Sequence, residues 1–304
     1  MTGIHEVTRK IFADGDFGRV DVLDLSDCQL DDECLIRLVP VFGHVSELYL
    51  SDNNFTWYGI RKLSAIHRRS KKLNKLDMSR WITLIFSTFL IWMICRCQLS
   101  QNGFYELIPI ILKTEHVVLQ GNQMTPIELK IFSSQLRESK KGSVVLKKLD
   151  ISNSNLTDES LQQIAKLVFL VEEIDLHNSN FGEEGIEMLV KCYHKFEGGV
   201  LKTINLRMCK LTNQCLYILS EIIPYLQSVV LSSNNFGGSS GLKALAESIN
   251  NAKGKNFPHL LLSSNDFLGR KLRHIDLRHS RVSQEMKKVV NEACRKHKID
   301  LKIW

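Results

Sequence analysis

Aspartate recurs between two apolar residues along this sequence. These carboxylates are the side chains best suited by type to catalysis or to metal binding. They stand in the triplets LDL, LDM, LDI, IDL and IDL, at Asp24, Asp77, Asp150, Asp175 and Asp276. Paired carboxylates can share a proton for acid–base catalysis, and clustered ones can bind a hard cation. Which chemistry is open to them depends on how the folded chain spaces them.

No second element of a catalytic or metal-binding site accompanies the aspartates. The sequence contains no GxSxG, GxxxxGK[ST], HExxH or GxGxxG motif. His177 stands near Cys192, but the pattern places the first on a strand and the second in a helix, where nothing orients a pair. The eight cysteines form no CxxC pair, and no histidine joins them at metal-ligand spacing. We therefore predict a protein without enzymatic activity, metal or cofactor.

The elements that carry the aspartates belong to an internal repeat. Ten segments share an LxxLxL core, in which alternate residues of a short strand are buried and the residue between them faces outward. The last apolar residues of these cores stand at positions 25, 50, 78, 119, 151, 176, 206, 231, 262 and 277. Asp24, Asp77 and Asp150 then lie on alternate strands. Because neighbouring strands are ~4.8 Å apart, these carboxylates are too distant for a catalytic dyad.

Each core leads into a turn and then a helix. At the turn, Asn can bond stacked backbone groups and Cys can fill a small apolar slot. The turn residues are Cys28, Asn53, Cys97, Asn122, Cys209 and Asn234. Residues of helix N-cap type follow, namely Asp31, Thr56, Ser100, Thr125, Thr157, Thr212 and Ser283. Such a strand–turn–helix unit is too small to bury its own core, so neighbouring units must stack.

The alternation of C-x-L and N-x-F turns with long helices resembles the ribonuclease-inhibitor-like class of leucine-rich repeat proteins. That class includes ribonuclease inhibitor and the C-terminal arrays of NOD-like receptors. The resemblance covers nearly the whole chain, although Ser154, Ser179 and Ser280 replace the Cys or Asn. It implies an α/β leucine-rich repeat solenoid, a horseshoe with an inner parallel β-sheet and outer α-helices. Residues 1–304 would form a single domain of about ten repeats.

An apolar insertion interrupts the third repeat at residues 80–95. The distance from position 78 to position 119 is 41 residues, and removing sixteen restores the 25 that a short–long alternation of spacings requires. The flanks then read LDMS–RCQLS, which matches LDLSDCQLD of the first repeat. The repeat is therefore complete without the inserted segment.

Four interpretations of Trp81–Cys95 are open. A membrane span needs roughly 20 apolar residues and would separate two halves of one repeat. A core helix is redundant, because the repeat supplies its own. An exposed apolar segment could dock on a membrane or a partner. We favour a retained intron, because the segment corresponds to 48 nucleotides in frame and the codons at both ends permit GT and AG splice sites.

Two features mark the C-terminal end of the array. Leu262 and Leu277 are only 15 residues apart, which leaves no room for a helical return between their strands. The connection is therefore tight, or one strand is displaced. Residues 283–304 contain an amphipathic helix and an alternating end, and we expect them to form a C-terminal cap.

The outward-facing strand residues are the predicted partner-binding site. Concave solenoid faces are the usual binding surface, and apolar anchors within a charged rim are typical of protein partners. The site residues are Asp24, Tyr49, Asp77, Val118, Asp150, Asp175, His177, Asn205, Arg207 and Val230. We predict a non-catalytic scaffold that binds a protein partner on this concave face. The alternatives are a sensor or adaptor array related to NOD-like receptors, and a membrane-associated protein anchored through residues 81–95.

Composition and charge limit the partners and the location. The apolar fraction of 44% and charged fraction of 24% are typical of a folded soluble protein, and the N-terminus lacks a signal-peptide core. We expect a cytoplasmic protein with reduced thiols, or a membrane-associated one if Trp81–Cys95 attaches it. The net charge of +7 is concentrated in basic loops. Helix dipoles favour that placement on their own and no aromatic residues interleave, so nucleic acid is not expected.

Overall fold

The computed structural model describes the chain in separate stretches. They are residues 22–42, 45–67, 73–78, 99–112, 114–139, 146–195, 200–236, 244, 259–262, 275–276 and 301–302. Residues 80–95 lie outside them, so the four interpretations of the insertion stay predictions. The C-terminal cap predicted for 283–304 is described only at 301–302.

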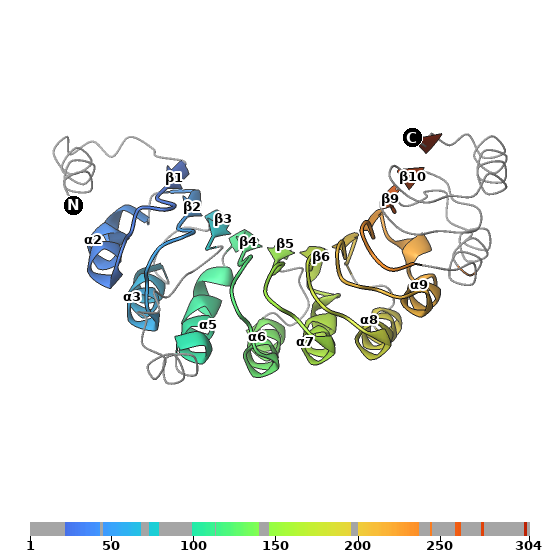
Figure 1. Cartoon of the computed structure of the whole chain (residues 1–304). Helices are drawn as coiled ribbons and strands as arrows, with labels where there is room; N and C mark the ends of the chain where they lie inside the picture. The colour runs from blue at the N-terminus through green and yellow to red at the C-terminus, as the bar shows by residue number, and fades with distance from the viewer. Residues whose placement is uncertain are drawn as a thin grey trace, which may run out of the picture. The chain divides into compact units, whose positions relative to one another are not determined.

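The chain divides into two compact units, Met1–Leu119 and Gln120–Trp304. The first contains four parallel strands that pair in chain order, β1 (Val22–Asp24), β2 (Glu47–Tyr49), β3 (Leu73–Asp77) and β4 (Thr114–Val118). Its helices are α2 (Asp32–Phe42), α3 (Trp57–His67) and α5 (Leu99–Ile111). These helices lie on one side of the strands (Figure 1). We call the other side the open face.

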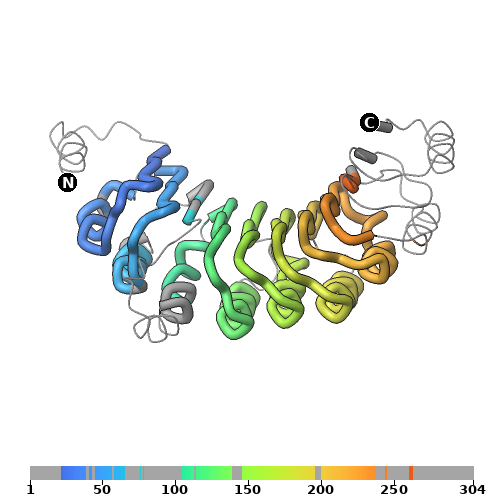
Figure 2. Tube along the Cα trace, viewed as in Figure 1, coloured from blue at the N-terminus to red at the C-terminus, as the bar shows by residue number. Residues whose placement is uncertain are grey.

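The second unit repeats this arrangement. Its strands pair in parallel and in chain order: β5 (Leu146–Asp150), β6 (Val171–Asp175), β7 (Thr203–Asn205), β8 (Ser228–Val230), β9 (His259–Leu261), β10 (Ile275–Asp276) and β11 (Leu301–Lys302). Its helices are α6 (Pro126–Ser139), α7 (Asp158–Ile164), α8 (Glu183–Lys195) and α9 (Asn213–Leu219). Two 3-10 turns, η1 (Ala165–Leu167) and η2 (Ile223–Tyr225), lead back towards the sheet. The path is traced in Figure 2.

Burial follows the predicted period of two. In the first unit Leu48, Leu76 and Val117 are aligned across the strands and are buried between sheet and helices. In the second unit the aligned buried row is Leu149, Ile174, Ile204, Val229 and Leu260. Each of the ten predicted cores contains a strand. The α/β leucine-rich repeat solenoid is confirmed as the fold, and the extent of a single domain over 1–304 stays a prediction.

The predicted turn residues fall into two classes with different backbones. The turns of Cys28, Ser154 and Cys209 each contain two non-glycine residues with positive φ, namely 27 and 29, 153 and 155, 208 and 210. The turns of Asn53, Asn122, Ser179 and Asn234 each contain one residue with positive φ, which is Asp52, Gly121, Asn178 and Ser233 respectively. Ser154 therefore takes the place of Cys, and Ser179 takes the place of Asn.

The Asn class ties each turn to the preceding one. Asn234 Oδ1 accepts from the backbone N–H of Cys209 at 2.9 Å and of Leu211 at 3.1 Å, and its Nδ2 donates to Leu206 O and Leu231 O at 2.8 and 3.0 Å. Asn53 does the same in the first unit, with Leu30 N at 2.9 Å and Leu25 O at 2.8 Å. Such bonds satisfy backbone groups that are buried where the chain leaves the strand.

Helix starts make a second contact between repeats. Asp158, the first residue of α7, accepts from the N–H of Gly182 at 2.6 Å, and a Cβ at Gly185 would lie 2.5 Å from the same Oδ1. In the first unit Asp32 of α2 likewise bonds Thr56 N and contacts Gly59. The predicted caps begin their helices at Asp31, Thr56, Thr125, Thr157 and Thr212. Ser100 is an exception, because α5 already begins at Leu99. Ser283 lies outside the described residues.

The third repeat has a strand and a helix in place on either side of residues 80–95. Met78 is buried, and its N–H donates to Val118 O at 2.8 Å. α5, which follows the insertion, packs beside α3 of the preceding repeat. At the C-terminal end β10 pairs directly with β9, with Ile275 opposite Leu260, despite the short spacing.

Candidate functional site

The predicted site residues occupy equivalent positions on the open face and are divided between the two units. In the first unit Asp24, Tyr49, Asp77 and Val118 are opposite one another in the strand register. In the second, the corresponding row is Asp150, Asp175, Asn205 and Val230. His177 and Arg207 follow two residues after Asp175 and Asn205, where the chain turns off β6 and β7.

Four acidic or amide side chains of these rows bond their own turn. Oδ1 of Asp24, Asp150, Asp175 and Asn205 accepts from the backbone N–H two residues later, at 2.9, 3.1, 3.0 and 3.1 Å. Asp150 also accepts from the hydroxyl of Ser152 at 2.6 Å. A short acceptor in this position satisfies a backbone donor that the strand no longer pairs. The recurrence of Asp here therefore has a local structural cause.

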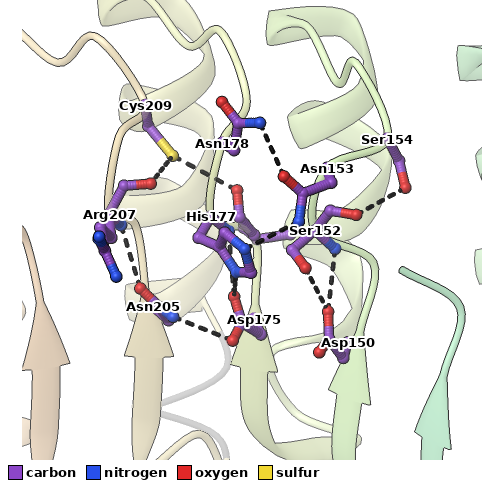
Figure 3. A network of polar contacts seen from close by, with 11 residues as sticks. Asp150, Ser152, Asn153, Ser154, Asp175, His177, Asn178, Asn205, Arg207 and Cys209 are labelled. Atoms are coloured by element: carbon purple, nitrogen blue, oxygen red, sulfur yellow. Dashed lines mark hydrogen bonds and ion pairs between the residues drawn. The ribbon is translucent and has the colours of Figure 1, made fainter. Parts of the chain in front are cut away.

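Asp175 is the centre of a polar network that crosses three repeats (Figure 3). Its Oδ1 also lies 2.9 Å from His177 Nδ1, and its Oδ2 accepts from Asn205 Nδ2 at 2.9 Å. His177 Nε2 lies 2.9 Å from Asn153 Nδ2, and Asn153 Oδ1 accepts from Asn178 Nδ2 at 2.7 Å. The two backbone donors on Asp175 and Asn205 orient this chain of contacts.

The hydrogen bonds of the network favour one tautomer of His177. Asp175 is an acceptor, so Nδ1 carries the proton, and Nε2 accepts from the Asn153 amide. An Asp–His pair also orients a general base in hydrolases, but here the second ring nitrogen faces an amide rather than a hydroxyl or thiol. The arrangement therefore holds side chains in place. The sequence pattern placed His177 among the outward-facing site residues, and the structure places it in the turn after β6, bonded to Asp175.

Arg207 differs from its neighbours on this face. Its backbone N–H is held by Asn205, whereas no hydrogen bond or ion pair of its guanidinium is found among the described residues. Met208 follows it and is 44% exposed. Val230 lies opposite Asn205 on the next strand and is half-buried. The turn after β7 thus carries an exposed cation and an exposed apolar residue in succession.

In the first unit two side-chain hydrogen bonds order the open face. The hydroxyl of Tyr49 donates to Glu47 Oε2 at 2.8 Å, and the hydroxyls of Ser51 and Ser26 are 2.8 Å apart. Tyr49 therefore lies along the face beside a carboxylate of its own strand.

Sequence reasoning missed Asn153, Asn178 and Met208 as open-face residues. The signal of the two asparagines is their place, two residues after the last apolar residue of the core, where φ is positive. Asn is common at such positions because it tolerates the left-handed region. Met208 carries no such signal, because an apolar residue is normally expected inside.

The described cysteines are structural. Burial raises the pKa of the Cys209 thiol to about 12, and burial also raises the pKa of Cys215 and Cys192. Cys192 is buried in α8, so it forms no pair with His177 on the open face. In the described stretches no three His, Cys, Asp or Glu side chains are grouped to hold a metal ion. Nor does any helix in those stretches have the length and apolar character needed to cross a bilayer.

Comparison with known proteins gives a family match and a larger set of similar structures, two of which are described below. A family model described as Leucine Rich repeat matches residues 143–165, which include β5, its turn and α7. No curated protein sequence matches the chain.

The chain is similar to an internalin (inlF) of Listeria monocytogenes, with 13% identity, a TM-score of 0.48, and coverage of 96% of this chain and 84% of that one. It is also similar to a chain of the yeast Rad7 and Elc1 complex, with 14% identity, a TM-score of 0.45, and coverage of 88% and 71%.

The unit that the family model matches recurs on both sides of residues 143–165, with the same buried row, turn and helix start. The ribonuclease-inhibitor-like subclass stays a prediction. The chain has the fold of a leucine-rich repeat solenoid.

Proposed function

We propose that the chain is a protein-interaction scaffold that binds a protein partner through the open face of its strands. The observation that carries the proposal is the Asp175 network, which orders exposed and half-exposed polar side chains without contributing to the apolar core. Binding surfaces whose side chains are already ordered lose less conformational entropy on association. The residues concerned are the outward-facing strand residues that were predicted from the sequence to bind a partner.

The open face offers a protein partner both polar and apolar contacts. Tyr49 and Val118 in the first unit and Val230 and Leu261 in the second interrupt rows of Asp and Asn. Apolar anchors surrounded by polar groups are characteristic of protein interfaces. This mixture supports binding of a folded or extended polypeptide.

Photo-cross-linking compares the open face with the helix side. A photoreactive phenylalanine analogue replaces Tyr49 or Val230, and the controls carry it at Tyr58 of α3 or Tyr217 of α9, which are 46% and 49% exposed. We expect discrete cross-linked protein bands in cells from the first two positions only. Cross-links that form only from Tyr58 and Tyr217 would show that the helix side is the binding surface.

A further inference from the structure

Two carboxylates of the open face in the second unit, those of Asp150 and Asp175, are already engaged by this chain. Asp175 accepts from His177 N, His177 Nδ1 and Asn205 Nδ2, so both of its oxygens are used. Oδ1 of Asp150 accepts from the N–H and hydroxyl of Ser152, and the residue is only 9% exposed. A basic partner would have to compete with these internal donors for the same oxygens.

The guanidinium of Arg207, in contrast to these carboxylates, is not engaged by the described part of the chain. Its five N–H donors are unused among the described residues, and the residue is exposed. Lys202, at the start of the same repeat, is instead paired with Glu172 at 2.7 Å. The backbone of Arg207 is nevertheless held, through Asn205 Oδ1 and through its own O, which accepts from Asn178 N at 2.9 Å. Arg207 is therefore a placed but unpaired cation (Figure 3).

Two apolar residues are near Arg207 in the sequence or in the strand register. Met208 is adjacent in the turn and exposed, and Val230 lies on the neighbouring strand β8. Arg and Met are both enriched in protein interfaces, and the guanidinium can hold a carboxylate by two parallel hydrogen bonds. The combination suits an acidic side chain that has an aliphatic neighbour.

We propose that Arg207, with Met208 and Val230, binds an acidic segment of a protein partner. The proposal rests on the scaffold function given above and specifies the chemistry of its partner. One carboxylate of the segment pairs with the Arg207 guanidinium, and an aliphatic residue beside it contacts Met208 and Val230. A nucleic acid fits less well, because its regularly spaced phosphates would meet the carboxylates of Asp150, Glu173 and Asp175 on the same face.

A peptide selection tests the proposal on the full chain without knowledge of the partner. A phage-displayed library of random dodecapeptides is selected on the wild-type chain, on Arg207→Glu and on Lys210→Glu. Lys210 is the control, because it is an exposed cation in the same turn. We expect peptides enriched in Asp and Glu on the wild-type chain and on Lys210→Glu, and none of that enrichment on Arg207→Glu.

Affinity measurements on one selected peptide sharpen the result. We expect Arg207→Glu to weaken binding at least tenfold and Lys210→Glu less than threefold, and we expect a peptide with its acid changed to Lys to regain binding to Arg207→Glu. Circular dichroism melts confirm that both variants are folded.

Three outcomes overturn the inference: no enrichment for acidic residues, equal loss in both variants, or competition by an oligonucleotide as strong as by the peptide. Selection of basic or neutral peptides that depend on Val230 would overturn the acidic partner alone. If no substitution on the open face changes the affinity for the peptide, the proposed function is contradicted as well.

Discussion

The turns after β6 and β8 occupy the same place in their repeats, yet they are held differently. After β8, Asn234 bonds four backbone groups of its own and the preceding turn. After β6, the hydroxyl of Ser179 is buried and has no hydrogen-bond partner in the described part of the chain. Both turns keep one backbone bond to the preceding repeat, from Asn235 N to Leu211 O at 2.9 Å and from Asn180 N to Leu156 O at 3.0 Å.

The difference teaches that the backbone defines the turn and the side chain adds stability to it. The turn after β6 lacks the inner tie, but it has an outer one, because Asn178 bonds Asn153 of the preceding turn on the open face. The stability of a turn inside the solenoid and the order of the side chains on the open face are thus separate properties.

Replacing Asn234 by Ser makes the turn after β8 resemble the turn after β6. We expect the free energy of unfolding to fall by roughly 3 kcal/mol. The reason is that buried backbone groups lose the amide of Asn234 as their hydrogen-bond partner, and the shorter serine side chain cannot reach them. Urea denaturation followed by circular dichroism measures the loss. Ser179→Ala is the control and should be nearly neutral, since it removes a hydroxyl that is already unpaired. A loss below about 1 kcal/mol at Asn234 would contradict the role of this tie.

The helix-start contact should matter most where the Asn tie is missing. Gly185→Ala places a Cβ 2.5 Å from Asp158 Oδ1 and 3.1 Å from its Cα. We expect a loss of about 2 kcal/mol by thermal unfolding, even though Ala is the better helix former. In an Asp158→Ala background the same change should cost less. Equal costs in both backgrounds would show that the crowding does not involve the carboxylate.

Cys209 and Ser154 occupy equivalent positions in their turns. Only the thiol of Cys209 should make the stability of its turn depend on alkaline pH. Burial raises the pKa of Cys209 to about 12, whereas the unfolded thiol ionises near pH 8.5. The buried thiol therefore adds stability below about pH 8.5 that is lost as pH rises towards 12. We expect the wild type to lose roughly 1.5 kcal/mol more than Cys209→Ser between pH 8 and pH 10 in urea titrations. Parallel pH profiles for the two proteins would refute this.

Ser179→Asn restores the inner tie in the turn after β6. The new amide should reach the backbone of Ser154 and Leu156, as Asn234 reaches Cys209 and Leu211. We expect a gain of about 1 kcal/mol in the free energy of unfolding, and slower hydrogen exchange at the Leu156 amide. Ser179→Gln is the matched control, because its longer side chain misplaces the amide. A gain in the Gln variant equal to that in the Asn variant would argue against a specific tie.

Much of the fold was predictable because its signals are short-range. The two apolar residues on either side of Asp175 or Asn205, the turn residue and a Thr or Asp cap all lie within about a dozen residues. The row of open-face positions followed from the same alternation and is confirmed by the strand register. Whether a partner binds there stays a proposal.

The roles of the site residues were less accessible. Asp150 and Asp175 were interpreted as an acidic ladder for a partner, but they cap their own turns. That use depends on backbone angles at the end of the strand, which residue types do not report. Met208 was missed because its exposure is set by the positive φ of its turn.

The sequence by itself determined the repeat, its alternation of two turn classes and the faces of its strands, because these depend on neighbours along the chain. Only the tertiary structure decided that Asp175 meets Asn205, 30 residues away, and that His177 meets Asn153, 24 residues away. Such contacts arise when stacking aligns equivalent positions of successive repeats. The same stacking leaves Ser179 without a partner and the guanidinium of Arg207 unpaired among the described residues, because a side chain's reach and direction are set by the repeat beside it.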